Sequence, residues 1–216
     1  TSGRFVWRTN CNNLRNTDYV VIFRAVDNFS PPLSDVKTIN IRLLAPPPKN
    51  ISGVYTRSTN SIRLTWQNPY VCSSNEKFKN FSVWRKKGCG MPLDSCSVDL
   101  ISLGYEKIGF TTNYFFVDQN MEFGNDYSYR IKAEFTDKSS GGVEFNPFSG
   151  FPSDEFCLKL PLDIPVIYNV DVKSTDIANG SIYIEWSKPN AEDLDTVFNP
   201  GPYKFILYRT EGMNGI

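Results

Sequence analysis

The absence of histidine from the 216 residues limits the chemistry that this chain could perform. Without an imidazole ring, the chain cannot build a Ser-His-Asp or Cys-His relay, a histidine zinc site or a switch that titrates near neutral pH. Carboxylate-only catalysis would remain available, but nothing in the sequence points to it. We therefore expect a protein that is not an enzyme and has no cofactor and no bound metal.

Cysteines are the most reactive side chains that remain. The sequence has no CxxC pair that could supply tetrahedral zinc ligands, so the cysteines fit an oxidising exterior better than a metal site. Their odd number leaves at least one thiol unpaired. The five are Cys11, Cys72, Cys89, Cys96 and Cys157.

Cys89 and Cys96 flank a short loop that follows an expected strand, and we predict that they form a disulfide. Closing a loop of about eight residues would stabilise the fold by roughly 2.5 kcal/mol, so a purely structural role is sufficient. A redox role would need a thiolate with a low pKa in an electropositive pocket, and we favour it less. Cys72 and Cys157 could also pair, but sequence alone leaves that connectivity open.

Aromatic side chains have two interpretations. Trp66, Trp186 and Tyr127 alternate with aliphatic residues, so we expect them in the core rather than in a sugar-stacking platform. Other aromatic residues lie in loops that contain Gly and Pro, where recognition surfaces are usually built. For the long loop at 145–152, we favour packing onto its own sandwich, because an exposed adhesive patch of phenylalanines would promote aggregation. The candidates for surface recognition are Tyr70, Phe145, Phe148 and Phe151.

Charged residues give weaker signals. Arg85, Lys86 and Lys87 could bind a polyanion, but adjacent residues of a strand point to alternating faces, so we favour a solvated strand edge. The carboxylates of residues 192, 193 and 195 could form a glycosidase pair or a calcium loop, although a solvated loop is the simpler interpretation. Equal numbers of basic and acidic residues, 23 each, argue against binding to nucleic acid.

Short runs of alternating aromatic and β-branched residues, separated by Gly, Asn, Pro and Ser, indicate an all-β protein. Proline-containing segments at 46–48 and 161–165 are expected to be stiff hinges between sandwiches. No apolar stretch is long enough for a membrane-spanning helix, and residues 1–8 do not resemble a signal segment. We expect the chain to begin within a longer protein.

Internal repetition supports this division. Ile62, Leu64 and Trp66 recur as Ile182, Ile184 and Trp186, so the last piece repeats the first half of the middle piece. The run from Asp18 to Ala25 corresponds in the same way to 126–133, within the second half of the middle piece. A repeat of this length suits tandem β-sandwiches of about 100 residues each. We predict the end of one sandwich at 1–45, a complete one at 46–162 and the start of a third at 163–216.

The middle piece resembles a fibronectin type III domain. Trp66 followed by Pro69 is similar to the tryptophan of the family's second strand, and 81–85 is similar to its third strand. Tyr127, Tyr129, Ile131 and Ala133 resemble the tyrosine corner and the sixth strand. The resemblance implies tandem antiparallel β-sandwiches of fibronectin type III or immunoglobulin-like type, incomplete at both ends of the chain.

The first piece resembles the end of a cadherin-like or immunoglobulin-like module through residues 25–34, but its linker lacks the carboxylates of a calcium-binding junction. The combination of modules is also similar to large repetitive cell-surface proteins of gliding bacteria. The cues are the segments at 81–89 and 192–203.

Together these features predict an extracellular or cell-surface adhesion, spacer or interaction module, associated with gliding motility. The alternative is a carbohydrate-binding or positioning module of a secreted polysaccharide-degrading enzyme. A two-module receptor ectodomain is less favoured, because no Trp-Ser-X-Trp-Ser sequence is present. Expected partners are other domains of the parent protein, other surface proteins or glycans. Incomplete sandwiches at the two ends could also associate through their strands.

Overall fold

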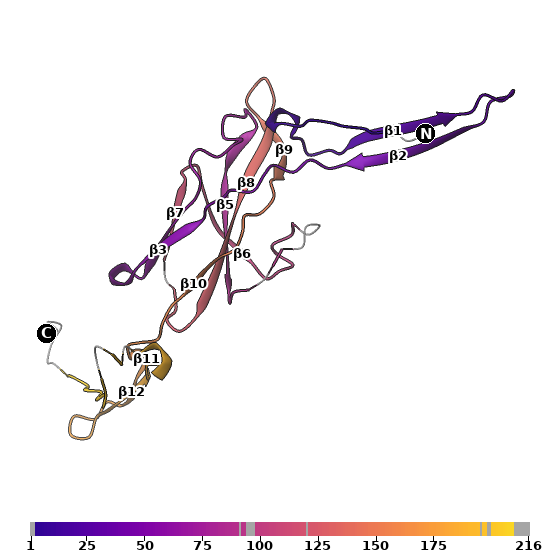
Figure 1. Ribbon diagram of the computed structural model, residues 1–216. Coiled ribbons are helices and arrows are strands. Elements are labelled where there is room, and N and C mark those ends of the chain that lie inside the picture. Colours follow the sequence, from indigo (N-terminus) through magenta and orange to yellow (C-terminus); the bar gives the residue numbers. More distant parts are fainter. Residues whose placement is uncertain are drawn as a thin grey trace. The chain divides into compact units, whose positions relative to one another are not determined.

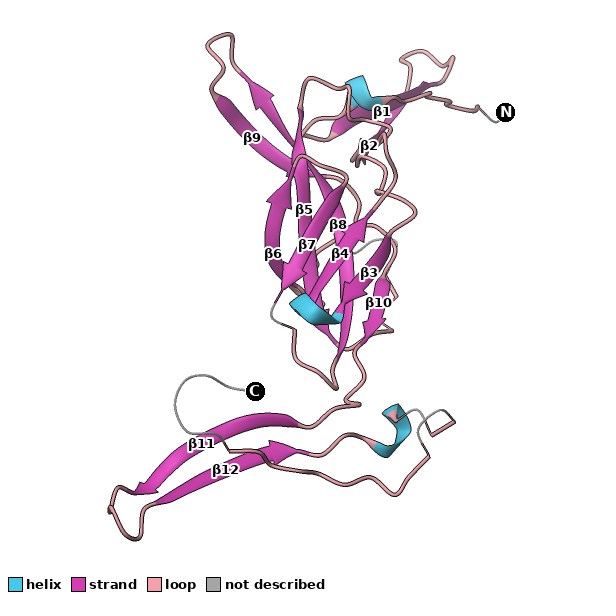
Figure 2. Cartoon of the chain, turned by 90° about the vertical axis from the view of Figure 1, so that its left-hand side faces the viewer, coloured by secondary structure: helices cyan, strands magenta, loops and turns pink. Residues whose placement is uncertain are grey.

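The computed structural model describes residues 3–90, 92–93, 98–119, 121–194, 196–197 and 200–209 (Figure 1). The chain divides into two compact units, Thr1–Lys159 and Leu160–Ile216. Strands dominate both units, and the helical elements among the described residues are single 3₁₀ turns (Figure 2). The sequence-based prediction of an all-β protein is therefore confirmed.

An antiparallel hairpin comes first, formed by β1 (Tyr19–Val26) and β2 (Ser34–Ile41). Asp27 closes its turn, because the carboxylate Oδ1 accepts hydrogen bonds from the backbone N–H groups of Phe29 and Leu33 at 3.2 and 2.8 Å. This acidic side chain is therefore used to cap its own loop.

A β-sandwich follows the hairpin. One sheet has the order β3-β4-β7, from β3 (Ser52–Thr56), β4 (Ser61–Thr65) and β7 (Phe115–Gln119), with the 3₁₀ turn η2 (Arg57–Thr59) between its first two strands. The other has the order β10-β8-β5-β6, from β5 (Phe78–Lys87), β6 (Glu106–Thr111), β8 (Asp126–Lys138) and β10 (Phe156–Lys159). β9 (Glu144–Ser149) pairs with the far half of β8. All these pairs are antiparallel.

The core lies between the two sheets and uses the alternating residues of each strand. Trp66 follows β4, is only 5% exposed, and contacts Phe81 of β5 edge-to-face with 5.3 Å between ring centroids. Tyr127 is also buried, and its hydroxyl oxygen accepts a hydrogen bond from the backbone N–H of Glu122 at 3.0 Å. The core positions and the tyrosine corner expected from the sequence are thus present. Other buried core residues are Ile62, Leu64, Val83, Tyr129, Ile131 and Ala133.

The outer face of the second sheet is partly covered by the excursion between β5 and β6. Trp84, Leu100 and Tyr105 form a second, smaller cluster there. Arg130 of β8 lies beneath it with 2% exposure, donating from Nε to the Tyr105 hydroxyl at 3.1 Å and from Nη1 to the Ser153 carbonyl at 2.7 Å. These bonds satisfy a charge that would otherwise be costly to bury.

The second unit contains the hairpin of β11 (Val166–Ser174) and β12 (Ser181–Ser187) and the 3₁₀ turn η3 (Ala191–Asp193). Trp186 of β12 is 40% exposed, so the prediction that it is a core residue is wrong for the described structure. The physical reason is that these two strands form a single layer, whereas Trp66 lies between two sheets. The sheets formed by β1 and β2 and by β11 and β12 have two strands each. Association between separate chains stays a prediction.

Candidate functional site: a disulfide-linked joint

The 3₁₀ turn η1 (Cys11–Asn13) fixes the position of Cys11 before the first hairpin. The Asn10 side-chain oxygen accepts from the backbone N–H of Asn12, and the Asn13 side-chain oxygen accepts from the backbone N–H of Asn10, both at 3.0 Å. This reciprocal capping satisfies backbone donors at the start of the turn. Asparagines on either side of Cys11 therefore hold its backbone in place.

Cys72 lies in the loop between β4 and β5, which is built from consecutive turns. The backbone N–H of Ser73 donates to the Tyr70 carbonyl at 3.0 Å, and that of Asn75 donates to the Cys72 carbonyl at 3.1 Å. The Asn75 side-chain oxygen accepts from the backbone N–H of Lys77 at 3.0 Å. Hydrogen bonds within the loop therefore order it independently of its contacts with the first piece.

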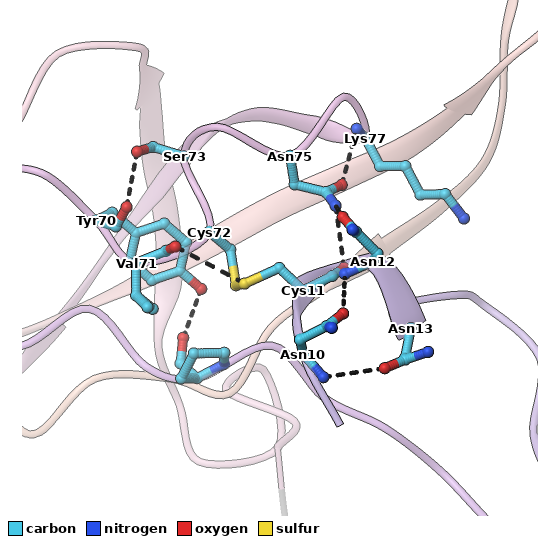
Figure 3. Close-up of a disulfide and its surroundings, with 11 residues drawn as sticks. Asn10, Cys11, Asn12, Asn13, Tyr70, Val71, Cys72, Ser73, Asn75 and Lys77 are labelled. Carbon is cyan, nitrogen blue, oxygen red and sulfur yellow. Dashed lines mark hydrogen bonds between the residues drawn. A yellow bond between two sulfur atoms is a disulfide. The ribbon is translucent and has the colours of Figure 1, made fainter. Parts of the chain in front are cut away.

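A disulfide joins Cys11 to Cys72 across 61 residues of sequence (Figure 3). Beside it, the Asn75 side-chain nitrogen donates to the Cys11 carbonyl and to the Asn12 side-chain oxygen, both at 3.0 Å. The option that Cys72 pairs with Cys157 is therefore wrong. The segment before β1 is linked covalently to the β4–β5 loop of the sandwich.

Lys77 adds a charged contact near the Cys11–Cys72 disulfide. We call this disulfide, together with the contacts around it, the joint. Its ammonium group donates to the Leu14 carbonyl at 3.0 Å and lies 3.1 Å from the Asp137 carboxylate of β8. Leu14 itself is 4% exposed. One side chain therefore connects the segment before β1, the β4–β5 loop and the long strand β8.

The proline segment 46–48 lies against the sandwich. The Ala45 carbonyl accepts from the backbone N–H of Phe151 at 2.9 Å, and the Pro46 carbonyl accepts from the Tyr70 hydroxyl at 2.6 Å. A Cβ added at Gly150 would lie 3.0 Å from the Cβ of Ala45, so this close approach favours glycine. The prediction of a hinge at 46–48 is wrong, because the Pro46 carbonyl is bonded to Tyr70 and the side chains of Ala45 and Pro48 are fully buried.

A second disulfide joins Cys89 to Cys157 across 68 residues, with 5.8 Å between their Cα atoms. The predicted Cys89–Cys96 pair is therefore wrong, and Cys96 itself lies outside the described residues. The reason is the order of the sheet: Lys87 of β5 and Leu158 of β10 both lie opposite Tyr127, on the two sides of β8. The chain after β5 passes the end of β8, and this brings Cys89 next to Cys157 although the two are far apart in sequence.

The side chains of the basic cluster bond to other residues of the sandwich. Arg85 contacts Glu106 at 2.7 Å and Asp118 at 3.0 Å, so it links β5 to β7 of the other sheet. Lys86 donates to the Leu103 carbonyl at 2.7 Å, whereas Lys87 forms an exposed ion pair with Glu122 at 2.7 Å. The three side chains have separate partners, and this arrangement gives no support to a joint polyanion site.

The four aromatic residues proposed for surface recognition do not form one exposed platform. Tyr70 is 2% exposed, so its assignment to the surface is wrong: its ring packs against Phe78 and Phe81 and its hydroxyl is bonded at the joint. Phe148 is half-buried and stacks on Phe135, with 5.4 Å between ring centroids. Phe151 is also half-buried, whereas Phe145 of β9 is 46% exposed.

The acidic run in the second unit serves its own turn. The Asp193 carboxylate accepts from the backbone N–H of Leu162 at 2.8 Å and from the Asn190 amide at 3.0 Å. Asp195 lies outside the described residues. Within the described part of the chain, no group of three or more Cys, Asp or Glu residues is arranged to hold a metal ion, and no helix is long and apolar enough to cross a membrane.

Sequence reasoning did not identify Asn75 and Lys77 as joint residues. Polar residues in a loop are common, and nothing in their local pattern distinguishes those that contact another segment. The only sequence signal near the joint is the run of asparagines around Cys11, which favours a capped turn. The joint becomes visible only when residues about 60 apart are brought together.

Comparisons with known proteins give matches among solved structures alone: no family model and no curated protein matches the sequence. An Fn3-like protein from Clostridium thermocellum is 22% identical, with a TM-score of 0.35 and coverage of 55% of this chain and 96% of that chain. Domains A168–A170 of titin are 16% identical, with a TM-score of 0.34 and coverage of 66% and 41%. Domains d3–d4 of the rat CD45 extracellular region are 15% identical, with a TM-score of 0.28 and coverage of 72% and 70%.

The class of module follows from the structure itself. Sheets of order β3-β4-β7 and β10-β8-β5-β6, the buried Trp66 and the corner made by Tyr127 define a fibronectin type III-like β-sandwich. The hairpin β11–β12 repeats the first hairpin of this sandwich, with Ile182 and Trp186 at the positions of Ile62 and Trp66. The chain therefore carries fibronectin type III-like modules in tandem.

Proposed function

We propose that this chain is a non-catalytic connector of a secreted or cell-surface protein, in which the joint at Cys11–Cys72 keeps adjacent modules at a fixed orientation. The observation that carries the proposal is the disulfide between the segment before β1 and the β4–β5 loop of the sandwich. The first piece and the sandwich therefore have two attachments instead of one: the disulfide and the backbone connection at 46–48. Two attachments oppose bending and rotation more strongly than a single linker.

Noncovalent contacts around the joint support the same role. Asn75 and Lys77 bond to backbone oxygens of Cys11 and Leu14, and Tyr70 bonds to Pro46. Each buried hydrogen bond contributes about 1 kcal/mol, and those made by a charged group contribute more. The contacts surround the disulfide, so they resist motion about several axes.

The two disulfides also support an oxidising, extracellular location for the connector. Disulfides persist in secreted and surface proteins, whereas thiols in the cytosol are kept reduced. Protease treatment of intact source cells should cleave the native protein, and protection of the protein in intact but not in lysed cells would contradict this location. The association with gliding motility stays a prediction from the sequence.

Stiffness of the joint can be measured as a distribution of distances. Spin labels introduced through non-cysteine chemistry at Asn40 of β2 and Val54 of β3, both exposed, should give one narrow distance distribution in the oxidised chain. Combining Cys11→Ser, Cys72→Ser and Asn75→Ala should broaden it, because the covalent link and its neighbouring bonds are removed.

A matched control is the Cys89→Ser/Cys157→Ser pair, which removes the other disulfide and leaves every joint contact in place. This control should keep the narrow distribution. The proposal would be contradicted if the unmodified oxidised chain already gave a distribution as broad as that of the joint variant.

A further inference from the structure

The two disulfides divide the chain in a way that matters when it is pulled. Cys11 is bonded to Cys72, and Cys89 is bonded to Cys157. The two loops that they close do not overlap, and the segment 72–89 lies between them. A covalent path from Cys11 to Cys157 therefore runs through the first disulfide, along 72–89, and through the second disulfide.

We propose that this path acts as a mechanical strap. It carries tension through the sandwich along β5 and shields the other strands from forced unfolding. The inference deepens the proposed function, because only a connector between parts of a longer assembly would experience such tension. β1 to β4, together with the proline segment, lie inside the first closed loop. β6 to β9 lie inside the second.

Lengths show how much the strap limits extension. Cys72 and Cys89 are 17 residues apart in sequence, a stretch that can extend to about 60 Å at about 3.5 Å per residue. The disulfides add Cα–Cα spans of only 5.6 and 5.8 Å. Without the disulfides, the 146 residues from Cys11 to Cys157 could extend to about 500 Å. Most of the chain is thus removed from the path of the load.

β5 is the complete strand within this path, and the sandwich holds it on both sides. Its register with β8 runs from Phe78 to Lys87, and its register with β6 runs from Phe81 to Arg85. Phe81 and Val83 are fully buried between the sheets. Moving β5 lengthwise must therefore break two ladders together and withdraw apolar side chains from the core. As a strand, β5 is also already close to its full extension.

The two ends of the strap lie where tension would enter and leave the sandwich. The Cys11–Cys72 disulfide delivers the load at the joint with the first piece, where Asn75 and Lys77 add their bonds. The Cys89–Cys157 disulfide passes it into β10, which ends at Lys159 at the boundary of the first compact unit. Tension thus enters and leaves the sandwich without passing through its edge strand β3 or through the β6–β9 region.

Single-molecule pulling tests the strap. Handles attached by non-cysteine chemistry at Arg8 and Lys159, both exposed and outside the closed loops, load the region directly in the full chain. A Cys96→Ser background removes the fifth sulfur. The oxidised chain should not extend beyond about 90 Å between the handles, and chemical reduction in the trap should release about 440 Å more in total.

Paired substitutions give separate signatures. Cys11→Ser/Cys72→Ser should restore extension over 61 residues, about 210 Å, and Cys89→Ser/Cys157→Ser should restore it over 68 residues, about 240 Å. Both variants should yield at lower force than the oxidised parent. Reduction of the folded parent gives the same comparison without any substitution, so a variant that fails to fold does not remove the test.

The strap is overturned if the oxidised parent extends past about 90 Å without reductant, or if parent and reduced chain yield at the same force. This failure differs from that of the proposed function, which is measured as a broad distance distribution at zero load. A stiff joint without a strap, or a strap with a freely bending joint, would each be recognised.

Discussion

At the scale of single residues, Tyr70 connects the core of the sandwich to the linker. Its ring packs on Phe78 and Phe81, and its hydroxyl donates to the Pro46 carbonyl at 2.6 Å. Burial raises its pKa above the ordinary value of 10.0. The folded chain therefore holds this side chain neutral at pH values where the unfolded chain ionises it.

This shift predicts how stability depends on alkaline pH. The raised folded-state pKa means that the contribution of Tyr70 is fully present below about pH 10 and is lost as the pH rises further, by up to about 1.4 kcal/mol per pH unit. In Tyr70→Phe, the free energy of unfolding should be lower by about 1 kcal/mol at pH 8, because one hydrogen bond is lost. Above pH 10, it should fall less steeply than in the parent.

Urea titrations from pH 8 to pH 11 measure both effects. Tyr129 remains in the variant and contributes a slope of the same sign, because burial and the nearby Asp118 carboxylate raise its pKa too. Equal slopes above pH 10 for the parent and Tyr70→Phe would contradict the burial of this hydroxyl at the joint.

Residue-level pattern predicted the core better than the joint. Trp66 and Tyr127 were placed correctly because alternation with aliphatic residues reports which face of a strand is buried. Tyr70 was misplaced because it follows Pro69 in a loop, where local sequence indicates exposure. Its ring is buried against Phe78 and Phe81 and its hydroxyl bonds to Pro46 of another segment, and no local pattern around Tyr70 records these contacts.

At the scale of elements, Asp118 of β7 links the two sheets. Its carboxylate accepts from Arg85 of β5 at 3.0 and 3.1 Å and from the Tyr129 hydroxyl of β8 at 2.8 Å. Asp118→Ala should lower the free energy of unfolding by about 3 kcal/mol, because it leaves a partly buried guanidinium and a buried hydroxyl without this acceptor. Chemical denaturation of the oxidised chain provides the measurement.

An exposed ion pair supplies the comparison for this prediction. Glu144 of β9 pairs with Lys79, and both side chains are well exposed, at 39% and 46%. Glu144→Ala should cost less than about 1 kcal/mol, since solvent screens such pairs. Equal losses for Asp118→Ala and Glu144→Ala would show that the link between the sheets contributes little.

Strand patterns predicted the sandwich, but not what connects its strands. The runs that became β4, β5 and β8 were recognisable from alternation and from their repetition along the chain. The pairing of Cys89 could not be recognised from these patterns, because it depends on β5 and β10 lying on opposite sides of β8. A loop closed by neighbouring cysteines was the simplest choice from spacing alone, and the order of the strands overturned it.

At the scale of the whole molecule, the same two disulfides explain the joint and the strap. One links the first piece to the sandwich, and the other links the chain just after β5 to the start of β10. Proline content indicated hinges, whereas the segment at 46–48 is held by a hydrogen bond to the Pro46 carbonyl and by bonds to the carbonyls of Ala45 and Lys49 on its two sides. Composition could report that this segment is extended, but it could not report what lies beside it.

Disulfide mapping tests the central claim most directly. The native chain, digested under conditions that block thiol exchange and without reductant, should yield peptides that link Cys11 to Cys72 and Cys89 to Cys157 in mass spectrometry. Recovery of a Cys89–Cys96 link, or of Cys11 and Cys72 as free thiols, would contradict both the joint and the load path.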